Sequence, residues 1–234
     1  MRVSSLATDS RGIVGRVLLG ILSVVVISSV TAASTVTIRT GNALIGQPDP
    51  LVRFLAEPSG LCGAGFPAAF TAADFAAASA GANPFVIPAF SPWIPSLPCD
   101  PLAQWVTPFA DNSARSALFA RDFVVPEPCC IHQATLTFCW AQDDWLGDLD
   151  TFINPGVFLN GTPLPIAGGS YAAETQAVVD VTGILHCGPN TLYVYDRDAG
   201  CAVSGLMYSA RFQIEECPVS VGPTTWGRLK ALYQ

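Results

Sequence analysis

The stretch LMYSARFQIEE (206–216) decides the fold class, because apolar residues recur in it at every second position. Successive side chains of a β-strand point to opposite faces, so one face of this stretch is apolar. That face carries Leu206, Tyr208, Ala210, Phe212 and Ile214. A second stretch, ATLTFCW (134–140), repeats the pattern with Ala134, Leu136, Phe138 and Trp140. Both stretches are predicted to be strands with one face in a core.

Further strands are predicted before and between these two, at 34–40, 116–125, 175–181 and 190–196. VFLNGTPLP (157–165) predicts a hairpin, because Asn-Gly suits the two positive φ angles of a tight β-turn. Asn160-Gly161-Thr162 also matches a glycosylation sequon, an alternative that matters only in a host that glycosylates. Short strands separated by turn signals favour an antiparallel β-sandwich.

One short helix is predicted in TAADFAAASAG (71–81), ahead of most of the strands. Thr71 can cap its first turn, Asp74 three residues later completes a capping box, and Gly81 suits the exit. A Pro-rich connection follows (83–101), where the proline rings remove backbone donors from any regular ladder. Three tryptophans in apolar or alternating contexts are expected in the core: Trp93, Trp105 and Trp140.

The N-terminal segment 1–33 has the pattern of a secretory signal peptide. Arg residues precede the apolar run VLLGILSVVVISSV (17–30), and small residues follow it. An uncleaved membrane anchor is the alternative. We expect a secreted or cell-surface protein with no membrane span in its mature chain. It would consist of a signal peptide (1–33), a folded domain (34–217) and a C-terminal tail (218–234).

Composition argues against nucleic acid as a partner. Of 11 Lys and Arg and 18 Asp and Glu residues, segment 1–33 holds three Arg and Asp9, which leaves 8 basic and 17 acidic side chains. An acidic surface repels phosphate backbones. Glycan or a cell-surface protein is the expected partner instead.

All eight cysteines follow the predicted signal peptide, and an even number in an exported chain indicates disulfides. They are Cys62, Cys99, Cys129, Cys130, Cys139, Cys187, Cys201 and Cys217. Many pairings are possible; we expect Cys62 to pair with Cys99, because both lie in the broader Pro-rich part of the chain that precedes most of the strands. A zinc site at Cys129, Cys130 and His132 is disfavoured, since adjacent cysteines do not match zinc-ligand spacing.

The order of segments from about 71 to 216 resembles the galactose-binding-like jelly roll, which many carbohydrate-binding modules share. The matching pieces are ALFARDFVVP, ATLTFCW, the acidic turn QDD, VFLNGTPL, VDVTGIL, GPNTLYVY and SGLMYSARF. The resemblance implies an all-β, antiparallel jelly-roll β-sandwich with one short helix in its N-terminal lead-in. The loop 140–156 departs from it, being longer than the turn usual between those strands. A short Trp-Gly-basic tail resembles the ends of some bacterial exported proteins.

The acidic loop is the predicted ligand site. An exposed indole beside carboxylates and amides suits sugar recognition, and the residues expected to provide them are Trp145, Asp143, Asp144 and Asn154. The alternative is that Trp145 folds back over the edge of the sandwich. Calcium prefers several oxygen ligands, so Asp144, Asp148 and Asp150 are a candidate Ca²⁺ set, although their spacing is not that of an EF-hand.

Catalysis has little support in the sequence. His132 and His186 are the only histidines, and neither belongs to a nucleophile motif. We therefore expect a non-catalytic recognition module, with carbohydrate as its ligand. The rival expectation is a structural or adhesive component of the cell envelope that binds no small ligand.

Overall fold

A computed structural model describes residues 33–217 except 112, 128 and 150–152. Within these ranges the chain forms twelve β-strands and one α-helix. That helix is too short to cross a membrane, and no other helix occurs in the described ranges. The predicted signal peptide, apart from Ala33, and the predicted tail lie outside the described residues.

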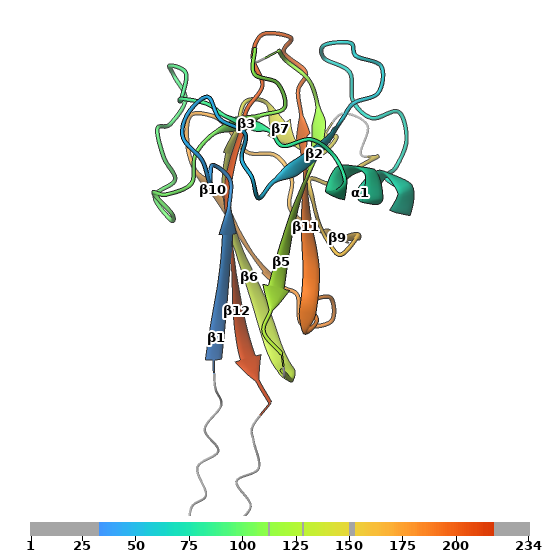
Figure 1. Cartoon of the computed structure of the whole chain (residues 1–234), viewed down its shortest axis with the longest axis vertical. Coiled ribbons are helices and arrows are strands. Elements are labelled where there is room, and N and C mark those ends of the chain that lie inside the picture. The colour runs from blue at the N-terminus through green and yellow to red at the C-terminus, as the bar shows by residue number, and fades with distance from the viewer. Residues whose placement is uncertain (1–32, 112, 128, 150–152, 218–234) are drawn as a thin grey trace, which may run out of the picture.

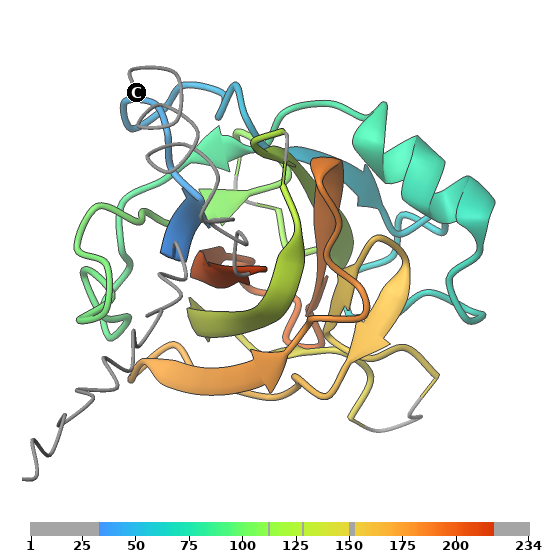
Figure 2. The same cartoon turned by 90° about the horizontal axis from the view of Figure 1, so that it is seen from below.

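Two antiparallel sheets face one another (Figures 1 and 2). The first sheet contains β1 (Ala33–Arg39), β12 (Leu206–Glu216), β6 (Ile131–Gln142) and β10 (Thr175–Asp180), extended by β4 (Val106–Thr107) and β3 (Phe85–Val86). The second contains β2 (Arg53–Ala56), β5 (Ala117–Val125), β11 (Gly188–Arg197), β8 (Val157–Leu159), β9 (Thr162–Leu164) and β7 (Trp145–Leu146).

The strand order is that of a jelly roll. Four strands in the order β1-β12-β6-β10 face four in the order β5-β11-β8-β9. The chain crosses from one sheet to the other after each of β5, β6, β9, β10 and β11. Consecutive strands therefore wrap around the core. This arrangement confirms the predicted fold class, including its single short helix.

The core between the sheets consists of the alternating residues that the sequence predicted. Leu136, Phe138, Phe212 and Ile214 are buried there. Phe212 of one sheet stacks on Phe123 of the other, with ring centroids 4.5 Å apart. Their contact joins the two inner faces directly.

The outer face of β12 departs from the simple alternation near its start. Met207 is buried on that face, together with Ala141 of β6, because the Pro-rich connection covers this part of the sheet. Trp93 and Trp105 of the covering segment lie against one another with centroids 4.3 Å apart. The prediction that these tryptophans are core residues is confirmed, in a second small core outside the sandwich.

The helix α1 spans Ala72–Ser79 and begins with the predicted capping box. Thr71 accepts a hydrogen bond from the Asp74 amide, and the Asp74 carboxylate accepts one from the Thr71 amide. Gly81 was predicted to suit the backbone conformation at the helix exit, but in the structure it is needed because the main chain of Phe54 lies too close for a side chain. A Cβ atom there would lie 1.9 Å from the carbonyl oxygen of Phe54.

The predicted hairpin turn joins β8 to β9, with φ angles of 53° at Asn160 and 80° at Gly161. The Asn160 side chain also links this turn to the next strands. Its Nδ2 donates to the Ile184 carbonyl at 3.0 Å and to Asn190 Oδ1 at 2.8 Å, and its Oδ1 accepts from the Thr191 amide. These bonds occupy the nitrogen atom that a glycan would modify.

All eight cysteines form disulfides, as predicted, but the expected Cys62–Cys99 pair is wrong. The pairs are Cys62–Cys201, Cys99–Cys139, Cys129–Cys187 and Cys130–Cys217. Cys62 lies against the loop after β11, whereas Cys99 lies over β6 on the outer face of the first sheet. The two cysteines share a Pro-rich region in sequence, but that region is divided between the two sheets.

Phe212→Ala tests the central contact between the sheets. We expect it to lower the free energy of unfolding by about 3–5 kcal/mol, because it removes a fully buried ring and leaves a cavity. Val178→Ala is the control, since Val178 is 65% exposed on β10 and its truncation is expected to cost under about 0.5 kcal/mol. Equal effects in urea denaturation would contradict this account of the core.

Candidate functional site at the loop edge

The acidic loop lies at the end of the sandwich where the long connections gather (Figure 1). Its first half is ordered by strand pairing, because Trp145 and Leu146 form β7 and pair with Arg197 and Asp196 of β11. The Asp143 amide also donates to the Gly205 carbonyl at 2.9 Å. Three of the predicted ligand residues, Asp143, Asp144 and Trp145, are therefore held together at this edge, each half-buried.

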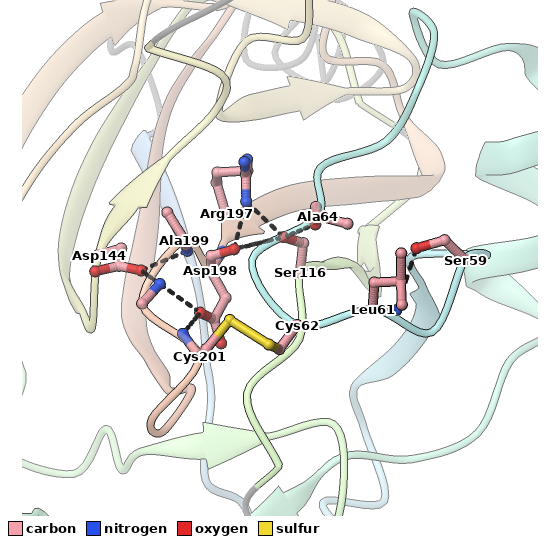
Figure 3. Close-up of a disulfide and its surroundings, with 11 residues drawn as sticks. Ser59, Leu61, Cys62, Ala64, Ser116, Asp144, Arg197, Asp198, Ala199 and Cys201 are labelled. Carbon is pink, nitrogen blue, oxygen red and sulfur yellow. Dashed lines mark hydrogen bonds between the residues drawn. A yellow bond between two sulfur atoms is a disulfide. The ribbon is translucent and has the colours of Figure 1, made fainter.

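Asp144 fixes the neighbouring loop (Figure 3). Its Oδ2 accepts hydrogen bonds from the amides of Ala199 and Gly200, at 2.5 and 2.8 Å. Oδ1 of Asp198 accepts from the amides of Gly200 and Cys201 at 3.0 and 3.3 Å. The Cys62–Cys201 disulfide then ties this loop to the segment before α1. Two carboxylates and one covalent bond thus hold the loop beside Trp145.

Four carboxyl groups gather behind this edge: Asp143, Asp144, Asp196 and Asp198. Burial raises the pKa of Asp143, and the nearby charges of Asp144 and Asp198 add to the effect; against a hydrogen bond from Trp93, which lowers it, the pKa is about 6. Burial also raises the pKa of Asp196 well above its ordinary value, with the same neighbours adding to the effect. Burial thus favours the neutral form of Asp196, while Asp143 changes charge at mildly acidic pH.

Asp148 lies inside the protein rather than at the edge, with only 4% of its surface exposed. Its Oδ1 lies 3.6 Å from Nε of Arg197 and accepts a hydrogen bond from the Tyr195 hydroxyl at 3.0 Å. Its Oδ2 accepts from the amide of Asn154 at 3.2 Å. Asp148 therefore neutralises a buried arginine.

Asn154 is also buried, at 2% exposed. Its Oδ1 accepts from the Phe70 amide at 2.9 Å and its Nδ2 donates to the Ala68 carbonyl at 3.0 Å. The side chain thereby fixes the loop that leads into α1. It does not reach the surface beside Trp145, where the sequence placed it.

Trp145 combines a partly exposed ring with an unpaired donor. Its indole N–H is buried and finds no acceptor among the described residues. The backbone around the ring is fixed by the β7–β11 pairing. An aromatic ring on a fixed strand, preceded in sequence by two carboxylates, is an arrangement that can receive the apolar face and the hydroxyl groups of a sugar.

The predicted Ca²⁺ set is not gathered by the described part of the chain. Asp144 and Asp148 are bonded to different parts of the fold, and Asp150 lies outside the described residues. In the described ranges, the one group of three side chains close enough to share a metal is Cys99, Cys139 and Glu174. Two of these form a disulfide and offer no thiolate. Calcium binding at Asp144, Asp148 and Asp150 stays a prediction.

Sequence reasoning missed Asp196, Asp198 and the contribution of Trp93. The signal for the two acids was present in YVYDRDAG (193–200), where charged residues interrupt an apolar strand at its end. Polar residues at the end of a buried strand are expected where loops converge on a site. The contact of Trp93 with Asp143 depends on the path of the Pro-rich connection, which no local pattern specifies.

Comparisons with known proteins give only distant structural similarity. No protein-family model and no curated protein matches the chain. Among solved structures, a native family 35 carbohydrate-binding module from Clostridium thermocellum is 11% identical, with a TM-score of 0.31 over 55% of this chain and 86% of that one. Another structure of a family 35 module from that organism is 16% identical, with a TM-score of 0.27 over 46% and 77%. Similarity at this level assigns neither a family nor a ligand.

Asp143→Asn tests the raised pKa. A raised carboxyl pKa means that the folded state binds the proton more tightly, so stability falls as pH rises from about 4 to about 6 and stays lower above. The variant should therefore unfold at a higher temperature than the parent at pH 7.5, with most of this gain lost at pH 4. Glu215→Gln removes an exposed carboxylate and reports the effect of net charge alone. A shift of the same size at both pH values would contradict the assignment.

Asp148→Ala distinguishes a structural ion pair from a calcium ligand. Removing the carboxylate leaves the buried Arg197 without this partner, which is expected to cost about 3–5 kcal/mol of unfolding free energy. The loss should be the same in EDTA and in excess calcium. A cost that appears only with calcium would instead support the metal prediction. Glu215→Ala, an exposed acid, is expected to change stability little.

Proposed function

We propose that this protein is a non-catalytic carbohydrate-binding module whose ligand contacts the loop edge. The observation that carries the proposal is the half-buried Trp145 side chain on a strand-paired segment, with Asp143 and Asp144 adjacent in sequence. The ring offers an apolar surface for sugar C–H groups. The carboxylates accept hydrogen bonds from hydroxyl groups, and bonds to an ionised acceptor are the stronger kind.

In this proposal the four predicted residues divide into two roles. Trp145 and Asp143 touch the sugar. Asp144 keeps Oδ1 available, since its Oδ2 is bonded to the loop 198–201, and Asn154 positions the surrounding loops from inside. The arrangement is fixed before ligand arrives, so little conformational entropy is lost on binding.

Export belongs to the same proposal. Four disulfides are typical of proteins that fold in an oxidising compartment, and a glycan-binding surface is useful outside the cytoplasm. The signal-like segment 1–33 would direct the chain there.

Trp145→Ala should reduce retention on a glycan array at least tenfold, because the stacking surface is lost. The truncation also removes some buried surface, so retention is measured at a temperature well below the unfolding midpoint of the variant. Leu102→Ala is the matched control, as Leu102 is 66% exposed and lies in a different loop. The array is run with and without calcium, which also tests the cation prediction.

Retention by Trp145→Ala equal to that of Leu102→Ala would contradict the assigned contact. A parent protein that retains no glycan in either buffer would overturn carbohydrate binding at this edge. That outcome would favour the structural or adhesive role that the sequence also allows.

A further inference from the structure

A hollow lies on the outer face of the first sheet, away from the loop edge. It has a volume of about 470 Å³ and is lined by β1, β12, β6 and β10. A smaller hollow of about 190 Å³ continues from it along the same strands, and Thr35 lines both. Together the two hollows form one groove that runs along the strands, which we call the sheet groove.

The upper end of the sheet groove is rigid. The Cys99–Cys139 disulfide fixes the Pro-rich connection to β6, and this places Asp100 over the sheet. Asp100 Oδ2 lies 2.7 Å from Arg39 Nε and accepts a 2.7 Å hydrogen bond from the Ser209 hydroxyl. Burial raises the pKa of Asp100. Hydrogen bonds from Ser209, Arg39 and the Leu102 amide together lower the pKa by more than burial raises it, so the net shift is downward.

Two arginines and two carboxylates line the sheet groove: Arg39 and Arg211, with Asp100 and Glu215. Arg39 is paired with Asp100, while Arg211 on β12 forms no ion pair with any described residue. The register places Thr37 of β1 and Thr137 of β6 on either side of Arg211. A chain with a formal net charge of −7 thus presents one unpaired guanidinium between two hydroxyl groups.

We propose that the sheet groove binds an anionic polysaccharide, with an acidic group of the polymer on Arg211 and its hydroxyls on the flanking threonines. A guanidinium binds carboxylate and sulfate groups through paired hydrogen bonds. Threonine and glutamine side chains both donate and accept hydrogen bonds, which suits hydroxyl groups. The second hollow gives room for a further, uncharged unit of the same chain, because the Glu215 carboxylate there would accept hydrogen bonds from hydroxyl groups and repel an acidic group.

The character of the lining favours this ligand over others. No aromatic side chain lines either hollow in the described part of the chain, so ring stacking cannot supply affinity for a neutral sugar. The sheet groove lies over the face of the sheet, whereas a peptide strand would seek the unpaired backbone groups of a sheet edge. Binding should therefore depend on charge and weaken with salt.

The experiment is calorimetric titration of the purified protein with polygalacturonate, dextran sulfate and neutral dextran, in 20 mM and 300 mM NaCl. We expect binding of at least one anionic polymer, no binding of dextran, and weaker binding at high salt. Arg211→Ala should lower affinity at least tenfold. Arg53→Ala is the matched control, because Arg53 is an exposed arginine on the second sheet and should leave affinity unchanged. The two anionic polymers distinguish carboxylate from sulfate recognition.

Thr37→Glu provides a second variant that keeps Arg211 in place. Its carboxylate would pair with Arg211 across the strands, which supports the fold but occupies the guanidinium. We expect this variant to lose binding while unfolding at the parent temperature. Trp145→Ala should bind the anionic polymer as the parent does, which separates this inference from the loop-edge proposal. Absence of binding to both anionic polymers, equal affinity for dextran, or equal losses in Arg211→Ala and Arg53→Ala would overturn the proposal.

Discussion

The closure of two apolar sheet faces over one another is the constraint on which the rest of this molecule depends. Each fully buried Leu or Phe side chain contributes about 1.5–3 kcal/mol, and β6 and β12 supply these residues at every second position. A shift of one residue in their pairing would turn every such side chain toward solvent. The same register therefore specifies which side chains face outward, and so it specifies the sheet groove as firmly as the core. Arg211 lies between Thr37 and Thr137 because Phe212 is buried next to it.

The disulfides stabilise strand ends and long connections that the core between the sheets does not hold. Cys129–Cys187 and Cys130–Cys217 join strand ends near the start of β6, at the end of the sandwich that carries Ala33 and Glu216. Cys62–Cys201 and Cys99–Cys139 instead fix long connections that contain little regular structure. A disulfide typically contributes about 2–4 kcal/mol, mainly by restricting the unfolded chain. Here the second pair of bonds has a further consequence, because one holds the loop beside Trp145 and the other holds Asp100 above the sheet groove. One disulfide thus fixes a loop at each of the two proposed sites.

Sequence patterns predicted the long elements and failed where geometry depends on distant contacts. The alternation in β6 and β12, the Asn160-Gly161 turn and the Thr71 capping box are local signals, and the structure confirms them. The strands β3, β4 and β7 have two residues each, too few for any periodicity to appear. The inward turn of Asp148 and Asn154 follows from a buried arginine on β11 and a loop before α1, both far away in sequence. Disulfide pairing fails as a prediction for the same reason, because proximity in sequence does not determine which sheet a loop covers.

The chain termini of the described structure lie at one end of the sandwich and the loop edge lies at the other. Attachment through a terminus and ligand binding at the loop edge would therefore use different ends of the molecule. Ala33 and Glu215 are paired neighbours, so the described chain enters and leaves at the end opposite the loop edge (Figure 1). An attachment made through either terminus would therefore leave Asp143 and Trp145 facing away from the point of attachment. The sheet groove lies along the side of the sandwich, over β1, β6 and β12. A polymer lying in the groove would run parallel to the long axis of the sandwich, so it would leave the loop edge open to a different sugar.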